Sequence, residues 1–214
     1  MSPATIAKIF RSLSDSLPDP KTELVFQDHY QLLIAVMLSA QATDVSVNRV
    51  TTSLFKAAPT PEKMVQLGEK GIRKHIMSVG LFNTKAKNIL NTSRILLDEH
   101  NGGVPRTREA LEALPGVGQK TAGVVLNVAY GEATIPVDTH VYRVSNRLGL
   151  VRTKTPAETE KRLLAIVPRM FLPKAHHLLI LHGRYVCKAR RPLCVSCCVQ
   201  MLCEYQEKTA KVES

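Results

Sequence analysis

Apolar residues recur every three or four positions along most of the chain, which places them on one face of an α-helix. A first pattern runs through Ile6, Ile9, Phe10, Leu13 and Leu17. Similar patterns follow at Val47, Val50, Leu54 and Phe55, at Ala86, Ile89, Leu90, Ser93 and Leu97, and at Leu163, Leu164 and Val167. The sequence therefore predicts an all-α protein.

Proline and glycine separate these patterns. They cluster at 18–20, 59–61, 80, 102–105, 131–136, 156 and 173. Because such residues end helices or form tight connections, we expect about ten short helices. The sequence has no long linker, low-complexity tract or fixed repeat period, so any second domain must share the helices compactly.

The charge balance indicates an acidic partner. The 214 residues include 29 Lys and Arg against 18 Asp and Glu, a net charge of +11. Nucleic acid is the commonest partner of such a chain, and anionic membrane is the second. The sequence has no basic amphipathic anchor, and apolar runs such as Leu32 to Leu38 are too short to span a bilayer. We expect nucleic-acid binding and no membrane association.

The N-terminal sequence MSPATIAKIF has polar residues and Lys8 where a secretory signal would need an apolar run. We therefore expect a cytoplasmic protein with reduced thiols. The length suffices for one large domain or two small ones, each with its own core.

All five cysteines fall in one short C-terminal stretch. Cys187, Cys194, Cys197 and Cys203 have the spacing C-x6-C-x2-C-x5-C. Clustered thiolates in a reducing compartment are typical of a metal site, and both zinc and an iron-sulfur cluster accept four of them. Inert structural thiols would have no reason to crowd together. Cys198 adjoins a predicted ligand, so we expect it to point elsewhere as a small core residue.

A tight connection joins two helical patterns between Thr107 and Ala129. The patterns are TREALEAL and QKTAGVVLNVAY, and Pro115 to Gly118 lies between them. Glycines permit positive φ and close approach to the backbone, and the amides that open the second helix are free donors at the positive end of its dipole. This arrangement suits a phosphate, although an ordinary helix connection explains the glycines equally well.

Four separated motifs together resemble one family. They are LSAQATD (Leu38 to Asp44), LPGVGQKTA (Leu114 to Ala122), VDTH (Val137 to His140) and the cysteine array. In this order, and over nearly the whole chain, they are similar to the endonuclease III family, the bacterial branch of the helix-hairpin-helix DNA glycosylase superfamily. The resemblance implies a six-helix barrel domain over residues 22–132, including the hairpin, and a discontinuous iron-sulfur domain over 1–21 and 133–214.

The resemblance also implies an activity in base excision repair. Members remove oxidised pyrimidines from duplex DNA and cleave the strand at the abasic site. The implied partner is therefore double-stranded DNA of the bacterial nucleoid that contains damaged pyrimidines or abasic sites, and we expect a monomer. The base must leave the stack to be attacked, so the enzyme bends the duplex, flips the nucleotide and fills the hole.

Lys120 matches the family nucleophile, and Asp138 matches its catalytic carboxylate. The Lys120 amine would attack the anomeric carbon, expel the base and form a Schiff base, from which β-elimination cleaves the strand. The helix-start amides and partial desolvation would disfavour the ammonium form of this side chain. The alternative is a solvated charge, as for most lysines in the first turn of a helix. Asp138 would move a proton and stabilise the cationic sugar. It also precedes the pattern Val141, Val144 and Leu148, where an aspartate is favoured simply as a helix cap.

Further positions match residues of the family that bind DNA. Gln41 matches a residue inserted into the vacated space, and Leu81 one inserted beside the orphaned base. From residue type alone they would be a surface polar residue and a core leucine. Gly116 and Gly118 would present the hairpin backbone to a phosphate. His140 matches a residue that binds phosphate, and local contacts would explain it equally well.

The cysteine array matches the family's 4Fe-4S site, with one thiolate from Cys187, Cys194, Cys197 and Cys203 for each iron. Its first loop carries three cations, Lys188, Arg190 and Arg191. A cluster that serves as a scaffold would hold these cations toward the phosphates. The alternative is a plain solvated basic loop. Two positions depart from the family pattern: Cys198 replaces a common apolar residue, and Gln119 stands where a basic residue is frequent.

Two other functions fit part of the sequence. An adenine glycosylase of the same superfamily shares the cluster and the hairpin, but it lacks the lysine nucleophile and usually carries a further C-terminal domain. Lys120 and the chain end at Ser214 disfavour it. A catalytically silent DNA-binding module would have no need for Lys120 and Asp138 together. We therefore expect a DNA glycosylase with AP lyase activity.

Overall fold

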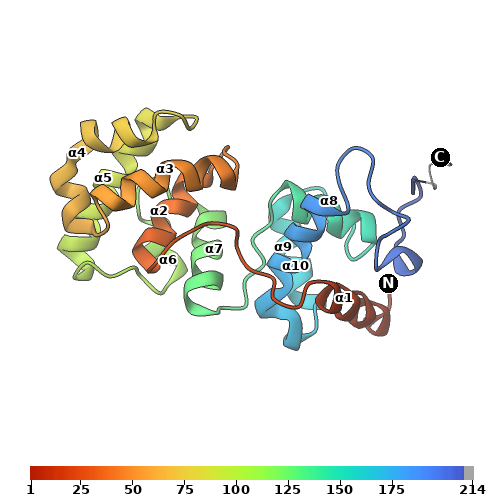
Figure 1. The fold of residues 1–214 in the computed structure, drawn as a ribbon. Helices are drawn as coiled ribbons and strands as arrows, with labels where there is room; N and C mark the ends of the chain where they lie inside the picture. The colour runs from red at the N-terminus through yellow and green to blue at the C-terminus, as the bar shows by residue number, and fades with distance from the viewer. Residues whose placement is uncertain (210–214) are drawn as a thin grey trace. The chain divides into compact units, whose positions relative to one another are not determined.

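A computed structural model describes residues 1–209 as helices joined by short loops (Figure 1). These residues form ten α-helices and two 3-10 turns, and no β-strand occurs among them. The all-α fold predicted from the periodicity is confirmed. None of the helices in this part of the chain is long and apolar enough to cross a membrane.

The chain divides into two compact units. Unit 1 contains Met1–Thr22 and the chain from Glu132 onward, and unit 2 is the continuous segment Glu23–Gly131. These bounds differ by one residue at each end from the domain limits expected from the resemblance, 22–132. The hairpin lies in unit 2, and the cysteines lie in unit 1.

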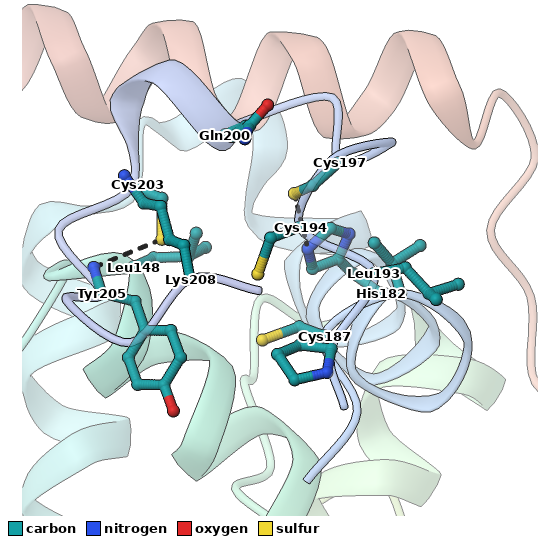
Figure 2. A pocket seen from close by; sticks show the side chains of 12 residues that line it. Leu148, His182, Cys187, Leu193, Cys194, Cys197, Gln200, Cys203, Tyr205 and Lys208 are labelled. Atoms are coloured by element: carbon teal, nitrogen blue, oxygen red, sulfur yellow. Dashed lines mark hydrogen bonds between the residues drawn. The ribbon is translucent and has the colours of Figure 1, made fainter. Parts of the chain in front are cut away.

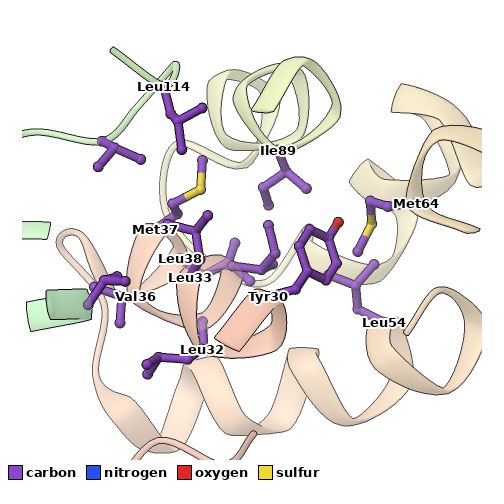
Figure 3. Packing of buried hydrophobic residues seen from close by; sticks show 14 of the residues in the cluster. Tyr30, Leu32, Leu33, Val36, Met37, Leu38, Leu54, Met64, Ile89 and Leu114 are labelled. Carbon is purple, nitrogen blue, oxygen red and sulfur yellow. The ribbon is translucent and has the colours of Figure 1, made fainter. Parts of the chain in front are cut away.

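Unit 2 is built around one helix that is buried along most of its length. Its helices are α2 (His29–Ser39), α3 (Asp44–Ala57), α4 (Pro61–Ile76), α5 (Phe82–His100), α6 (Arg108–Glu112) and α7 (Gln119–Tyr130). Every residue of α2 from Tyr30 to Leu38 is buried, as expected for a helix that is apolar on all sides. Leu54, Met64 and Ile89 from α3, α4 and α5 pack into the same core (Figure 3).

The way each helix of unit 2 begins divides the helices into two groups. Asp28, Thr43, Thr60 and Thr107 cap α2, α3, α4 and α6, and each side chain accepts a hydrogen bond from an amide of the first turn. By contrast, the N-cap residues of α5 and α7 are Leu81 and Gly118, and neither forms a side-chain cap. These two N-cap residues are ones that matched DNA-binding positions in the sequence.

Unit 1 joins the N-terminal helix to the C-terminal part of the chain. Its helices are α1 (Pro3–Ser16), α8 (Thr139–Leu148), α9 (Pro156–Ile166) and α10 (Leu172–Tyr185), with 3-10 turns at Arg169–Phe171 and Gln200–Leu202. The predicted apolar face of α1 is buried, and Phe10 stacks on Phe171 with ring centroids 5.9 Å apart. Cys187, Cys197 and Cys203 pack against this same core.

Candidate functional site

Four of the five cysteines surround one pocket in unit 1. Figure 2 shows Cys187, Cys194, Cys197 and Cys203 around this space. The space between the four sulfur atoms has room for more than one water molecule. Cys198 does not line the pocket. It is exposed, with its sulfur 3.5 Å from Ser16 Oγ, so the expectation that it would be a small core residue is wrong.

The pocket disfavours thiolates unless a positive centre balances them. Burial raises the pKa of the Cys197 thiol to about 11, and burial also raises the pKa of Cys203. A bound metal deprotonates coordinating thiols outright. Among residues 1–209, no three His, Cys, Asp or Glu side chains converge closely enough to hold a single metal ion. The four soft donors thus share a pocket without the closed geometry of a one-ion site.

Two arginines of α8 anchor the first loop of the cysteine array. Arg147 donates to the carbonyl oxygens of Lys188 at 2.7 Å and Ala189 at 3.0 Å, and its guanidinium lies 4.4 Å from the centre of the Tyr205 ring. Arg143 donates to the carbonyl oxygen of Cys187 at 3.1 Å. These bonds hold the backbone of the loop.

The three cations of that loop point outward. Lys188, Arg190 and Arg191 are exposed, and Arg191 has a left-handed backbone with φ 50°. The arginines of α8 hydrogen-bond the backbone of this loop. The position of its basic surface therefore depends on these arginines as well as on the cysteines.

Asp138 and His140 lie at the start of α8. Asp138 is the N-cap, and its Oδ1 accepts a hydrogen bond from the Val141 amide at 2.8 Å. One carboxylate oxygen therefore holds the helix start while the other is not used by the cap. The Nδ1 of His140 lies 3.2 Å from Nη2 of Arg143. Because a guanidinium only donates, this nitrogen is the acceptor, and His140 makes a local contact.

The hairpin exposes its two glycines for different reasons. Leu114 and Val117 are buried and anchor the turn, while Gly116 and Gly118 are exposed. Gly116 has φ +79°, and a Cβ there would lie 2.6 Å from Nδ2 of Asn88 in α5. Gly118 has an extended backbone with φ −97°, and a Cβ there would meet nothing within 4 Å. Gly116 is needed by the fold, whereas Gly118 leaves room for something outside it.

Lys120 is the second residue of α7 and is exposed. The sequence led us to expect partial desolvation of this amine. Its exposure shows that unit 2 by itself leaves the Lys120 side chain in solvent. Lys120 belongs to unit 2 and Asp138 to unit 1.

Gln41 and Leu81 share an unusual conformation. Both are exposed, with φ values of 55° and 59°. Leu81 is 59% exposed, so residue type alone, which favours a core leucine, gives the wrong location. A left-handed backbone costs a residue other than glycine about 1–2 kcal/mol. Such strain at two exposed positions is typical of functional loops.

Comparison with known proteins identifies the family. Residues 34–169 match the HhH-GPD superfamily of base excision DNA repair proteins. Endonuclease III of Escherichia coli (strain K12) is 53% identical over 208 residues, which are 97% of this chain and 99% of that protein. The chain belongs to the endonuclease III family. Endonuclease III of Rickettsia conorii is 52% identical over 205 residues, 96% of this chain and 98% of that protein.

A solved structure of a family member has the same fold. It is described as a trapped endonuclease III-DNA covalent intermediate with an estranged adenine. It matches with a TM-score of 0.89 and 43% identity, and the match covers 95% of this chain and 96% of the other. The sequence-based prediction of a base excision repair enzyme of the endonuclease III family is therefore confirmed.

Sequence reasoning missed several residues that support the site. Arg143 and Arg147 stand one turn apart on α8 and bind backbone carbonyls about 40 residues later in the chain. Their spacing beside the buried positions Val141, Val144 and Leu148 is a weak signal that identifies the helix face but not the acceptor. Lys85 of α5 was also missed, although it adjoins Ala86 in a strongly apolar pattern.

Proposed function

We propose that this endonuclease III family member excises oxidised pyrimidines from duplex DNA and then cleaves the strand through a Schiff base on Lys120. The observation that carries the proposal is the start of α7. There an exposed lysine follows a helix start that has no side-chain cap and an open glycine. A phosphate bound to these free amides would bring the adjoining sugar to the amine.

The chemistry of the proposed reaction needs a neutral amine. A duplex docked over α7 would exclude water from the exposed Lys120 amine. The amine nitrogen then bonds to C1′ of the sugar, and the base leaves with the electron pair of the glycosidic bond. The C1′–O4′ bond then opens, with a proton passing to O4′, and gives the iminium. Loss of a C2′ proton from the iminium expels the 3′ phosphate and cleaves the strand. A trapped covalent intermediate of a relative at 43% identity supports this route.

Asp138 would assist this reaction with the carboxylate oxygen that the helix cap leaves unused. We expect it to accept a proton and to stabilise the positive charge that develops on the sugar as the base departs. The cap bond from the Val141 amide fixes the carboxyl group, so the second oxygen has a defined direction. In this proposal one carboxylate has both the structural and the chemical role.

Cys187, Cys194, Cys197 and Cys203 would hold a 4Fe-4S cluster, since they supply four soft donors around one pocket and exclude Cys198. When bound, the cluster supplies a structural cross-link of the C-terminal loops. Lys188, Arg190 and Arg191 would then contact DNA phosphates. We expect the protein to bind damaged sites in the nucleoid as a monomer. Gln41, Leu81, the hairpin glycines and His140 would complete the DNA surface.

Borohydride trapping tests the proposed function. Borohydride added during turnover on abasic or oxidised duplexes should yield a covalent protein-DNA adduct, and Lys120→Gln should abolish the adduct while keeping DNA binding. Lys63→Gln is the matched control, because Lys63 is another exposed lysine in a first helical turn. Undiminished trapping by Lys120→Gln would identify another amine as the nucleophile. A wild-type protein that binds but never nicks abasic DNA would be the silent module.

The same assay separates the role of Asp138. Asp138→Asn keeps a good helix cap and should therefore keep the fold. It should slow base excision by roughly 10²- to 10⁴-fold, yet retain trapping on a preformed abasic site, where no base departs. Equal loss on both substrates would contradict the proposed division of roles.

A further inference from the structure

A buried lysine connects the two loops that carry Gln41 and Leu81. Lys85 lies one turn into α5 and is only 7% exposed. Its Nζ donates to the carbonyl oxygens of Leu38 at 2.8 Å and Ala40 at 2.7 Å, both at the end of α2. Burial lowers the pKa of this amine. Burying a charged side chain costs free energy unless it is hydrogen-bonded. The two carbonyl oxygens are therefore specific acceptors for this amine.

The carbonyls that Lys85 binds belong to a tight turn. The Ala42 amide donates to the Ser39 carbonyl at 3.1 Å, which closes a four-residue turn. Ala40 has φ −57° and ψ 116°, and Gln41 has φ 55°. These values define a type II turn, in which the third position favours glycine. Gln41 therefore has a left-handed backbone conformation that residues other than glycine disfavour.

Lys85 selects this turn over the more common alternative. Types I and II differ mainly in ψ of the second residue, which is about −30° in type I and about +120° in type II. That difference rotates the peptide between Ala40 and Gln41, and with it the Ala40 carbonyl. The bond from Lys85 to this oxygen holds the carbonyl in its type II direction. The cation also lies at the negative end of α2, where it is favoured.

The same residue also holds the second loop. The backbone amide of Lys85 donates to the Leu81 carbonyl at 3.0 Å, which is the first hydrogen bond of α5. Leu81 is the N-cap residue of that helix, has a left-handed backbone and forms no side-chain cap. Lys85 thus links Gln41 and Leu81, two exposed residues with a left-handed backbone, through one side chain and one amide.

We propose that Lys85 is a positioning residue that holds Gln41 in the conformation required for insertion into DNA and fixes it relative to Leu81. The proposal rests on the proposed function, in which both side chains enter the duplex. It assigns to Lys85 no contact with the substrate.

Lys85→Met tests the proposal, because methionine keeps a flexible stem of similar shape and removes the three donors. Without its donor, the Ala40 peptide can rotate and Gln41 leaves the left-handed region. Since small misplacements of a positioned group cost about 10²-fold, kcat/KM for excision from duplex DNA should fall by about that factor. Lys87→Met is the matched control, since Lys87 is an exposed lysine on the same helix, and it should stay within about twofold of wild type.

A double-mutant cycle distinguishes positioning from general support of the fold. If Lys85 acts through Gln41, then Lys85→Met should have little further effect in a Gln41→Ala protein, where there is no long side chain to position. 2-Aminopurine opposite an abasic site should report the same coupling, with its fluorescence rise lost in Lys85→Met and in Gln41→Ala alike. Independent, multiplying losses in the cycle would overturn the proposal.

Two controls keep the outcome clear. If Lys85→Met does not give a helical protein, Lys85→Gln, which retains a neutral donor, carries the same cycle with the same two outcomes. Wild-type protein and Lys120→Gln are assayed in parallel. If the wild-type protein shows neither trapping nor excision, the proposed function is refuted. If the wild type is active and Lys85→Met is equally active, only the positioning role of Lys85 is refuted.

Discussion

Replacing Gly116 with alanine should destabilise unit 2 before any DNA is bound. The new Cβ would lie 2.6 Å from Nδ2 of Asn88 and 3.1 Å from both its Cβ and its Cγ. The Asn88 side chain can rotate its amide group away, but its Cβ is fixed by the backbone of α5. In addition, the backbone at position 116 has φ +79°, which an alanine adopts poorly.

The expected magnitude is the sum of these two effects. The left-handed backbone costs an alanine about 1–2 kcal/mol, and overpacking at a tight contact costs about 1–3 kcal/mol. The free energy of unfolding should therefore fall by about 3 kcal/mol, a large part of the roughly 5–15 kcal/mol typical of a domain. Asn88→Ala removes the amide and should restore about 1 kcal/mol of the loss, because the backbone cost remains.

Urea unfolding followed by helical circular dichroism measures this loss, and fluorescence anisotropy with an abasic duplex measures binding. Gly118→Ala is the control, since its Cβ meets nothing within 4 Å. It should change stability by less than about 1 kcal/mol yet weaken DNA binding, because the new methyl group would obstruct the phosphate that we propose to bind there. A Gly116→Ala protein as stable as wild type would refute the packing argument. Full DNA affinity in Gly118→Ala would refute the proposal that the hairpin binds a phosphate.

Three further outcomes follow from the unit that holds the cysteines. Cys198→Ala should keep bound iron and its broad visible absorption, whereas Cys197→Ala should lose both; loss of iron from Cys198→Ala would overturn the assignment of the four ligands. Replacing Arg190 and Arg191 together with alanine should make the slope of log affinity against log salt shallower by about one unit for each phosphate that the variant no longer neutralises, and an unchanged slope would mean that the loop faces away from DNA. Burial, with a smaller contribution from Arg184, lowers the pKa of His177 to about 4. As pH falls, His177 therefore binds a proton in the unfolded chain at a higher pH than in the folded one. Between about pH 6.5 and pH 4, this residue alone should lower the free energy of unfolding by about 3 kcal/mol. His177→Gln should lose that part of the pH dependence of urea unfolding, and a curve parallel to wild type would assign the dependence to other groups.

Local patterns predicted the parts of the structure that depend on neighbouring residues. The periodicity from Gln119 to Tyr130 matches the bounds of α7, and the aspartate before Val141 forms the predicted cap of α8. Both results depend on residues within one or two helical turns, where sequence spacing and spatial distance agree. The predicted helix in TREALEAL is present but shorter, because α6 ends at Glu112 ahead of Pro115.

Long-range contacts were beyond sequence reasoning. Nothing local to Lys85 indicates that its acceptors lie more than 40 residues earlier, at Leu38 and Ala40. In the same way, Leu81 looks like a core residue until its left-handed backbone is known, since a leucine carries no signal for that conformation. The misplacement of Cys198 has the same origin, because its exposure depends on where the turn beside α1 runs.

The division of the chain also sets an order of events during synthesis. Unit 2 is one continuous segment and has all its core residues once Gly131 has left the ribosome. Helix α1 is made first, but Phe10 and Leu13 find their core only when Phe171 and Leu178 emerge. At about 5–20 residues per second, the apolar face of α1 waits roughly 8 to 30 s for its partners. The first helix synthesised is therefore among the last to be buried, and during that interval its apolar face is open to a chaperone.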